Sequence, residues 1–116
     1  MKEFNKVKGD IGEFEAQKFL KNLGMKILGT NYKNKIGEID IVALDKNVIV
    51  FIEVKRRETL AFGRPVEAVD YRKQQKIKKT AEMYLIFKKK PYADVRFDVI
   101  EIVGDQINYI KNAFMW

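Results

Sequence analysis

The sequence contains no cysteine and no histidine among its 116 residues. The absence of cysteine excludes disulfide bonds, zinc ribbons and thiol nucleophiles, and it fits a reducing compartment. The absence of histidine excludes the commonest general base and every site that needs an imidazole. Any chemistry must therefore use aspartate, glutamate, lysine, tyrosine, serine or threonine side chains, or a metal bound by oxygen ligands.

Long apolar runs are also lacking. No stretch approaches the roughly 20 residues of a membrane-spanning helix. The opening segment MKEFNKVKGD is too polar for a secretory signal. We therefore expect a cytoplasmic protein with no membrane partner, and the length favours one domain over residues 1–116.

Positive charge is plentiful, because 23 lysine and arginine residues stand against 16 aspartate and glutamate residues, for a net charge of +7. A small basic domain is expected to bind polyanions, with nucleic acid ahead of an anionic membrane surface. The alternative interpretation is a basic, soluble surface that has no such partner.

The residue pattern predicts the element order α-β-β-β-α-β-β. The apolar spacing and the turn residues place a helix over residues 9–23, strands over 25–28, 38–44 and 48–56, a helix over 70–88, and strands over 94–103 and 106–110. The stretch GTNYKNKIG reads as a turn, and Asp70 is the expected N-cap of the second helix. The order indicates a mixed sheet flanked by helices, of the α/β or α+β class.

The stretch FIEVK places Glu53 and Lys55 at the end of an otherwise apolar strand. Pairing this strand with the preceding one around residues 46–47 puts Asp40 opposite Glu53 and Glu38 opposite Lys55, all on one face. A register slip by one residue would separate the carboxylates. The other face then carries only apolar side chains: Ile39, Ile41, Ala43, Val50, Ile52 and Val54.

Opposed carboxylates on neighbouring strands repel each other, and partial burial increases the repulsion, so a compensating positive charge is expected. Lys55 supplies one such charge, and a divalent cation would supply more. Mg²⁺ binds one or two protein carboxylates and completes its shell with water and phosphate oxygens, which matches Asp40 plus Glu53. The alternative is a charge ladder that pairs Glu38 with Lys55 and Asp40 with Arg57, and the spacing alone does not choose between them.

Asp40 followed by Glu53-Val54-Lys55 resembles the PD-(D/E)XK nuclease superfamily. The stretches GEFEAQKFL, GEIDIVALD, VFIEVKRR, FGRPVEAV and RFDVIEI together resemble the YraN family of bacterial proteins, across nearly the whole chain. This resemblance implies the α/β class with a restriction-endonuclease-like αβββαβ core, similar to archaeal Holliday-junction resolvases. The residue before Asp40 is Ile39 rather than proline, whereas the metal-binding and lysine positions of the motif are intact.

The resemblance further implies a metal-dependent endonuclease that uses Mg²⁺, or Mn²⁺ in its place. Asp40 and Glu53 would hold the metal, and Lys55 would orient the attacking water or stabilise charge on the phosphorane. Resolvase-like members also place a first-helix glutamate near the metal, and the Gly-Glu pattern assigns this role to Glu13. The helical wheel alone does not choose between Glu13 and Glu15, and a solvated glutamate is the alternative for both.

Four basic residues are the candidates for nucleic-acid contacts: Arg56, Arg57, Arg64 and Lys73. Lys73 lies four residues before the apolar Ile77, so helical spacing directs it inward, at the start of the second helix. The other lysines of that helix are expected to form a solvated face. Phosphate contacts of this kind give salt-dependent binding that is largely independent of sequence.

DNA is the favoured partner over RNA, with branched or structured DNA as the candidate substrate. The alternative function is a non-catalytic nucleic-acid-binding module on a nuclease-like fold, and a third is a protein-interaction or ribosome-associated factor. The tail INYIKNAFMW predicts either a homodimer interface or packing against the parent sheet.

Overall fold

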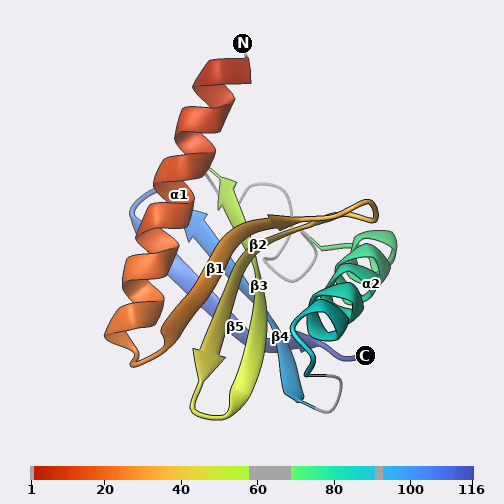
Figure 1. The fold of residues 1–116 in the computed structure, drawn as a ribbon. Coiled ribbons are helices and arrows are strands. Elements are labelled where there is room, and N and C mark those ends of the chain that lie inside the picture. Colours follow the sequence, from red (N-terminus) through yellow and green to blue (C-terminus); the bar gives the residue numbers. More distant parts are fainter. Residues whose placement is uncertain (1, 58–68, 91–92) are drawn as a thin grey trace.

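The computed structural model describes residues 2–57, 69–90 and 93–116. Its elements are α1 (Lys2–Asn22), β1 (Lys26–Lys33), β2 (Glu38–Asp45), β3 (Val48–Arg57), α2 (Tyr71–Phe87), β4 (Asp94–Val103) and β5 (Gln106–Phe114). The strands form one sheet in the order β1-β2-β3-β4-β5, and α1 and α2 flank it (Figure 1). Because β3 and β4 are parallel while the other pairs are antiparallel, the predicted mixed α/β sheet is confirmed.

The central strand β3 sends successive side chains into two separate cores. Val50 and Ile52 pack with Ala16 and Leu20 of α1, on one face of the sheet. Phe51 packs on the other face against α2, where its ring meets the Tyr84 ring edge-on at 5.5 Å between centroids. Burial on both faces explains why this strand is a nearly continuous apolar run, as central strands between helices usually are.

The second helix begins and ends close to the predicted bounds. The side chain of Asp70 accepts a hydrogen bond from the Lys73 backbone N–H at 2.8 Å, so the predicted N-cap is confirmed. The first helix instead begins at Lys2, before the predicted start at residue 9. Gly9 was interpreted as a boundary, but a single glycine inside a helix costs only about 1 kcal/mol and does not stop it.

The strand predicted over residues 25–28 is longer in the structure, because β1 continues to Lys33 through the stretch interpreted as a turn. The pairing of β1 with β2 shifts register between Ile27 and Gly29, and Asn31 has a positive φ of 52°. Asparagine tolerates this conformation better than most residues, so the irregularity is absorbed within the strand. The turn residues therefore mark a bulged strand rather than its end.

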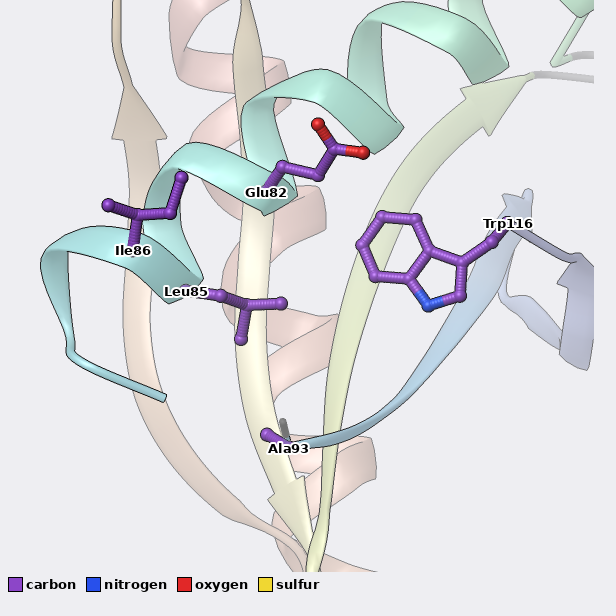
Figure 2. A pocket seen from close by; sticks show the side chains of 5 residues that line it. All are labelled: Glu82, Leu85, Ile86, Ala93 and Trp116. Carbon is purple, nitrogen blue, oxygen red and sulfur yellow. The ribbon is translucent and has the colours of Figure 1, made fainter. Parts of the chain in front are cut away.

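The C-terminal segment packs against its own sheet. β5 continues to Phe114, beyond the predicted end at residue 110, and the Phe114 ring stacks on Phe97 at 5.0 Å between centroids. Trp116 meets the same Phe97 ring edge-on, also at 5.0 Å. Figure 2 shows the indole facing a hollow beside the C-terminal end of α2. The packing alternative is thus confirmed for this tail, and a homodimer stays a prediction.

Neither α1 nor α2, as far as the structure describes them, is long and apolar enough to cross a membrane.

Candidate active site

The β2–β3 hairpin has the predicted register, with Val42 opposite Phe51 and Ile41 opposite Ile52. Next to that last pair, Asp40 is bonded to β3 through its side chain. Its Oδ2 accepts a hydrogen bond from the Val54 N–H at 2.8 Å. The Asp40 carboxylate is therefore fixed at the end of the ladder, next to the strand that carries Glu53.

One expectation about this hairpin was wrong. Strict alternation predicted Ile39 on the face of Ile41, but Ile39 packs in the α2-side core with Val42 and Phe51. The opposite strand β1 is irregular here, since Asn31, between the residues that pair with Ile39 and Ile41, has a positive φ. The positive φ of Asn31 marks a departure from regular strand geometry, and strict alternation, on which the expectation depended, does not hold at this point of the sheet.

Asp40 and Glu53 line one cavity of about 200 Å³. Its other lining residues come from the β1–β2 turn, from β2 and from α2: Gly37, Glu38, Lys73, Lys76 and Ile77. A Cβ atom on Gly37 would lie 3.0 Å from Thr80 Oγ1, so a glycine here lets the turn approach α2 closely. The hairpin of β1 and β2 reaches the N-terminal half of α2 in Figure 1, where this cavity lies.

The ammonium groups of two lysines lie near one carboxylate oxygen of Glu53. Lys73 Nζ lies 2.7 Å from Glu53 Oε1, and Lys55 Nζ lies 3.8 Å from the same atom. Burial and the neighbouring Lys73 ammonium lower the pKa of Lys55. Burial opposes a charge on Lys73 as well, but the hydrogen bonds to Glu53 and Lys55 and the negative charges of Glu53 and Asp40 together outweigh burial and raise the pKa of Lys73. The carboxylate of Glu53 thus lies in a strongly cationic environment.

Asp40 has the most perturbed carboxyl of the cavity. Burial, and then the negative charge of Glu53, raise the pKa of Asp40 from 3.8 to about 7, although the Val54 hydrogen bond opposes the rise. The charge of Glu13 adds to the increase. Glu15 instead forms an ion pair with Arg56 at 3.6 Å. Glu13 and Glu15 therefore interact with different groups, and the metal role of Glu13 stays a prediction.

The donor set suits a small divalent cation bound by few protein ligands. Among the residues that the structure describes, no three acidic, histidine or cysteine side chains gather closely enough to form a metal cluster. Asp40 and Glu53 are the two motif carboxylates of the cavity, which Glu38 also lines. Mg²⁺ takes one or two protein carboxylates, with water and phosphate oxygens as its other ligands. The residues present thus fit Mg²⁺ or Mn²⁺, and a contribution of Glu13, directly or through water, stays a prediction.

Arg56 and Arg57, two of the predicted nucleic-acid-binding residues, form ion pairs with acidic side chains. Arg57 Nε and Nη2 donate to Glu101 Oε2 at 2.9 and 2.6 Å, and the Glu101 side chain is fully buried. Arg56 pairs with Glu15, and Lys55 pairs with Glu53, so neither ion pair of the alternative charge ladder is the pairing observed. Arg64 lies outside the described residues.

Comparison with known proteins supplies the family. Residues 12–102 match a family described as uncharacterised protein family UPF0102. The chain belongs to this family. A UPF0102 protein of Caldanaerobacter subterraneus is 47% identical over 98% of this chain and 100% of its own length. UPF0102 proteins of Clostridium botulinum and Persephonella marina are 50% and 43% identical, over 95% and 96% of both chains.

Membership of UPF0102 confirms the resemblance to YraN-type proteins within the restriction-endonuclease-like superfamily.

Two features of this UPF0102 chain were not predicted. Lys76 lines the cavity together with Lys73, and their three-residue spacing on α2 was the available signal. Glu101 faces Lys55 across the parallel β3–β4 pair, and no local pattern indicates that register.

A second buried ionic cluster lies among the α1-side residues of the sheet. The carboxylate of Asp98, fully buried, accepts hydrogen bonds from Arg96 Nε, from the Tyr109 hydroxyl and from the Asn112 N–H. Arg96 Nη1 also contacts Asp45 Oδ2 at 3.0 Å. Burial, and then the hydrogen bond to Asp98, raise the pKa of Tyr109. Because both oxygens of Asp98 have donors, we interpret this cluster as structural.

Proposed function

We propose that this protein is a metal-dependent nuclease that hydrolyses phosphodiester bonds in DNA, with branched or structured DNA as the substrate. The carrying observation is that Asp40 and Glu53 share one cavity, and that the Lys55 ammonium lies 3.8 Å from Glu53 Oε1. Two carboxylates and a lysine in this arrangement match the requirements of phosphodiester hydrolysis.

Each residue has a distinct part in this proposal. Bound Mg²⁺ or Mn²⁺ would lower the pKa of a coordinated water and neutralise charge on the phosphate. Asp40, anchored by the Val54 N–H, and Glu53 would hold that ion. Lys55 would place its ammonium against the negative charge that develops on the phosphorane. Burial of the Glu53 side chain, which is 8% exposed, keeps these electrostatic contacts away from bulk water.

A second hollow supports nucleic acid as the partner. This hollow, of about 340 Å³, lies on the exposed side of α2, and its lining is polar and basic: Tyr71, Arg72, Gln75, Lys76 and Lys79. Lys76 lines both hollows, so the basic surface continues into the cavity of Asp40 and Glu53. The Tyr71 side chain is 74% exposed and offers an aromatic face on which an unpaired base could stack.

A cleavage assay tests the proposal directly. Labelled linear, single-stranded, flapped and four-way-junction DNA, and RNA, would be incubated with Mg²⁺, Mn²⁺ or EDTA. Lys55→Ala is the test variant, and Lys111→Ala, an exposed lysine of β5, is the matched control. We expect metal-dependent cleavage that is lost in Lys55→Ala and retained in Lys111→Ala. Cleavage that persists in Lys55→Ala at the wild-type rate would refute the assignment.

The alternative of a non-catalytic nucleic-acid-binding module draws support from one contact. The Lys73 ammonium, 2.7 Å from Glu53 Oε1, compensates that carboxylate without any metal. This alternative predicts DNA binding that weakens with salt and no cleavage of any substrate with either metal. Gel shifts at 50 and 200 mM salt, run beside the cleavage assay, distinguish the two functions.

A further inference from the structure

Lys73 occupies the space that a cation bound to Glu53 would need. Its ammonium lies 2.7 Å from Glu53 Oε1, which is hydrogen-bonding distance, and Lys55 approaches the same oxygen at 3.8 Å. A Mg²⁺ ion would sit about 2.1 Å from that oxygen, where it would meet the Lys73 ammonium and be repelled by it. The observed contact and a metal bound to Glu53 Oε1 therefore compete.

The main chain at Lys73 is held by the helix cap, whereas its side chain is partly exposed. The Asp70 side chain caps the helix by accepting the Lys73 N–H, and Gln74 Nε2 donates to the Val69 carbonyl at 3.0 Å. The Lys73 side chain is 40% exposed, against 8% for Glu53. A flexible four-carbon stem can thus swing the ammonium into solvent while the helix stays in place.

We propose that Lys73 is a displaceable counter-ion of Glu53. It neutralises this carboxylate in the metal-free protein, leaves when a divalent cation binds, and then contacts a phosphate of the nucleic acid at the rim of the cavity. This inference rests on the proposed metal site at Asp40 and Glu53. It makes Lys73 a positioning residue that couples metal binding to phosphate binding.

Metal affinity without nucleic acid gives the first test. Mn²⁺ binding to the full chain would be measured by titration calorimetry and by the electron paramagnetic resonance signal of free Mn²⁺. The variants are Lys73→Gln, Lys76→Gln and Glu53→Gln. Lys76 lines the same cavity, so Lys76→Gln removes an equal charge from the same space while the Lys73–Glu53 contact stays in place.

We expect Lys73→Gln to bind Mn²⁺ about tenfold more tightly than Lys76→Gln, because only the former removes a competing, partly buried ion pair. Glu53→Gln should lose binding. The second readout is the affinity for a short DNA duplex in Ca²⁺, followed by fluorescence anisotropy. There, Lys73→Gln should weaken binding, since it lacks the ammonium that contacts phosphate. Opposite signs in the two assays would not arise from a merely structural role.

Three results would contradict the inference in distinguishable ways. Equal Mn²⁺ affinity in Lys73→Gln and Lys76→Gln, with normal binding by the wild type, overturns the counter-ion exchange and leaves the metal site intact. Weaker Mn²⁺ binding in Lys73→Gln than in the wild type likewise overturns the counter-ion exchange and leaves the metal site intact. Absence of Mn²⁺ binding in the wild type overturns the exchange together with the proposed metal-dependent function.

Discussion

Replacing Asp40 by asparagine should stabilise the protein at alkaline pH. Burial and Glu53 raise the pKa of Asp40 from 3.8 to about 7, so the folded protein resists ionisation of this carboxyl. A rise of this size corresponds to about 4 kcal/mol of unfolding free energy that wild type loses once Asp40 is ionised. Asparagine resembles the protonated acid and can still accept the Val54 hydrogen bond.

The direction of the pH dependence follows from proton binding. Between pH 3.8 and about 7, the folded state retains a proton on Asp40 that the unfolded state has released. Wild-type stability attributable to Asp40 is therefore complete below pH 3.8, falls as the pH rises through this window, and stays low above it. The Asp40→Asn variant lacks this dependence. The excess of its unfolding free energy over that of wild type should therefore grow from near zero at pH 4 to about 2–4 kcal/mol at pH 8.5.

Urea unfolding followed by circular dichroism, at half-unit intervals between pH 4 and 9, measures this advantage. Asp94→Asn, at an exposed position of β4, is the matched control and should show no such trend. In millimolar Mg²⁺ at pH 8.5 we expect the gap to narrow, since a cation that binds only folded wild type stabilises it. An Asp40→Asn variant no more stable than wild type at pH 8.5, or a gap that does not shrink toward pH 4, would refute the reasoning.

Three further substitutions test other parts of the structure. Asp70→Ala removes the N-cap of α2 and should lower the unfolding free energy by about 1 kcal/mol in urea titrations. Arg57→Met leaves the buried Glu101 carboxylate without its cation and should cost about 3–5 kcal/mol by the same assay; Arg57→Met with Glu101→Gln should recover most of that loss. Tyr71→Ala should weaken binding of single-stranded DNA by about 1–3 kcal/mol in anisotropy titrations, whereas Phe87→Ala, an exposed aromatic at the other end of α2, should not.

The sequence predicted the carboxylate pair because its geometry is local. A two-residue turn fixes the register of the hairpin up to the Ile41–Ile52 pair, and Asp40 and Glu53, the next residues beyond that pair, line one cavity. The inward direction of Lys73 followed from its helical spacing to Ile77. Its contact with Glu53 did not follow, because that depends on where α2 crosses the sheet, which the sequence pattern does not specify.

The features that the sequence did not predict depend instead on long-range geometry. The pairing of Arg57 with Glu101 requires the register of two parallel strands separated by α2, and no turn constrains that register. The extension of β1 past Gly29 was missed because turn-forming residues also occur in bulges, where pairing with a neighbouring strand outweighs local preference. Both features depend on contacts between distant parts of the chain.

Charge compensation explains why a cation would bind at this end of the sheet. Glu101 has the guanidinium of Arg57, and Glu53 has the ammonium groups of Lys73 and Lys55. Asp40 is anchored by a neutral N–H, and burial beside Glu53 raises its pKa to about 7. An added divalent cation would therefore gain most from ionising Asp40, while its approach to Glu53 would require the Lys73 ammonium to leave. Metal binding should thus move a lysine toward the substrate and release a proton near neutral pH, and titration calorimetry in buffers of different ionisation enthalpy would detect the released proton.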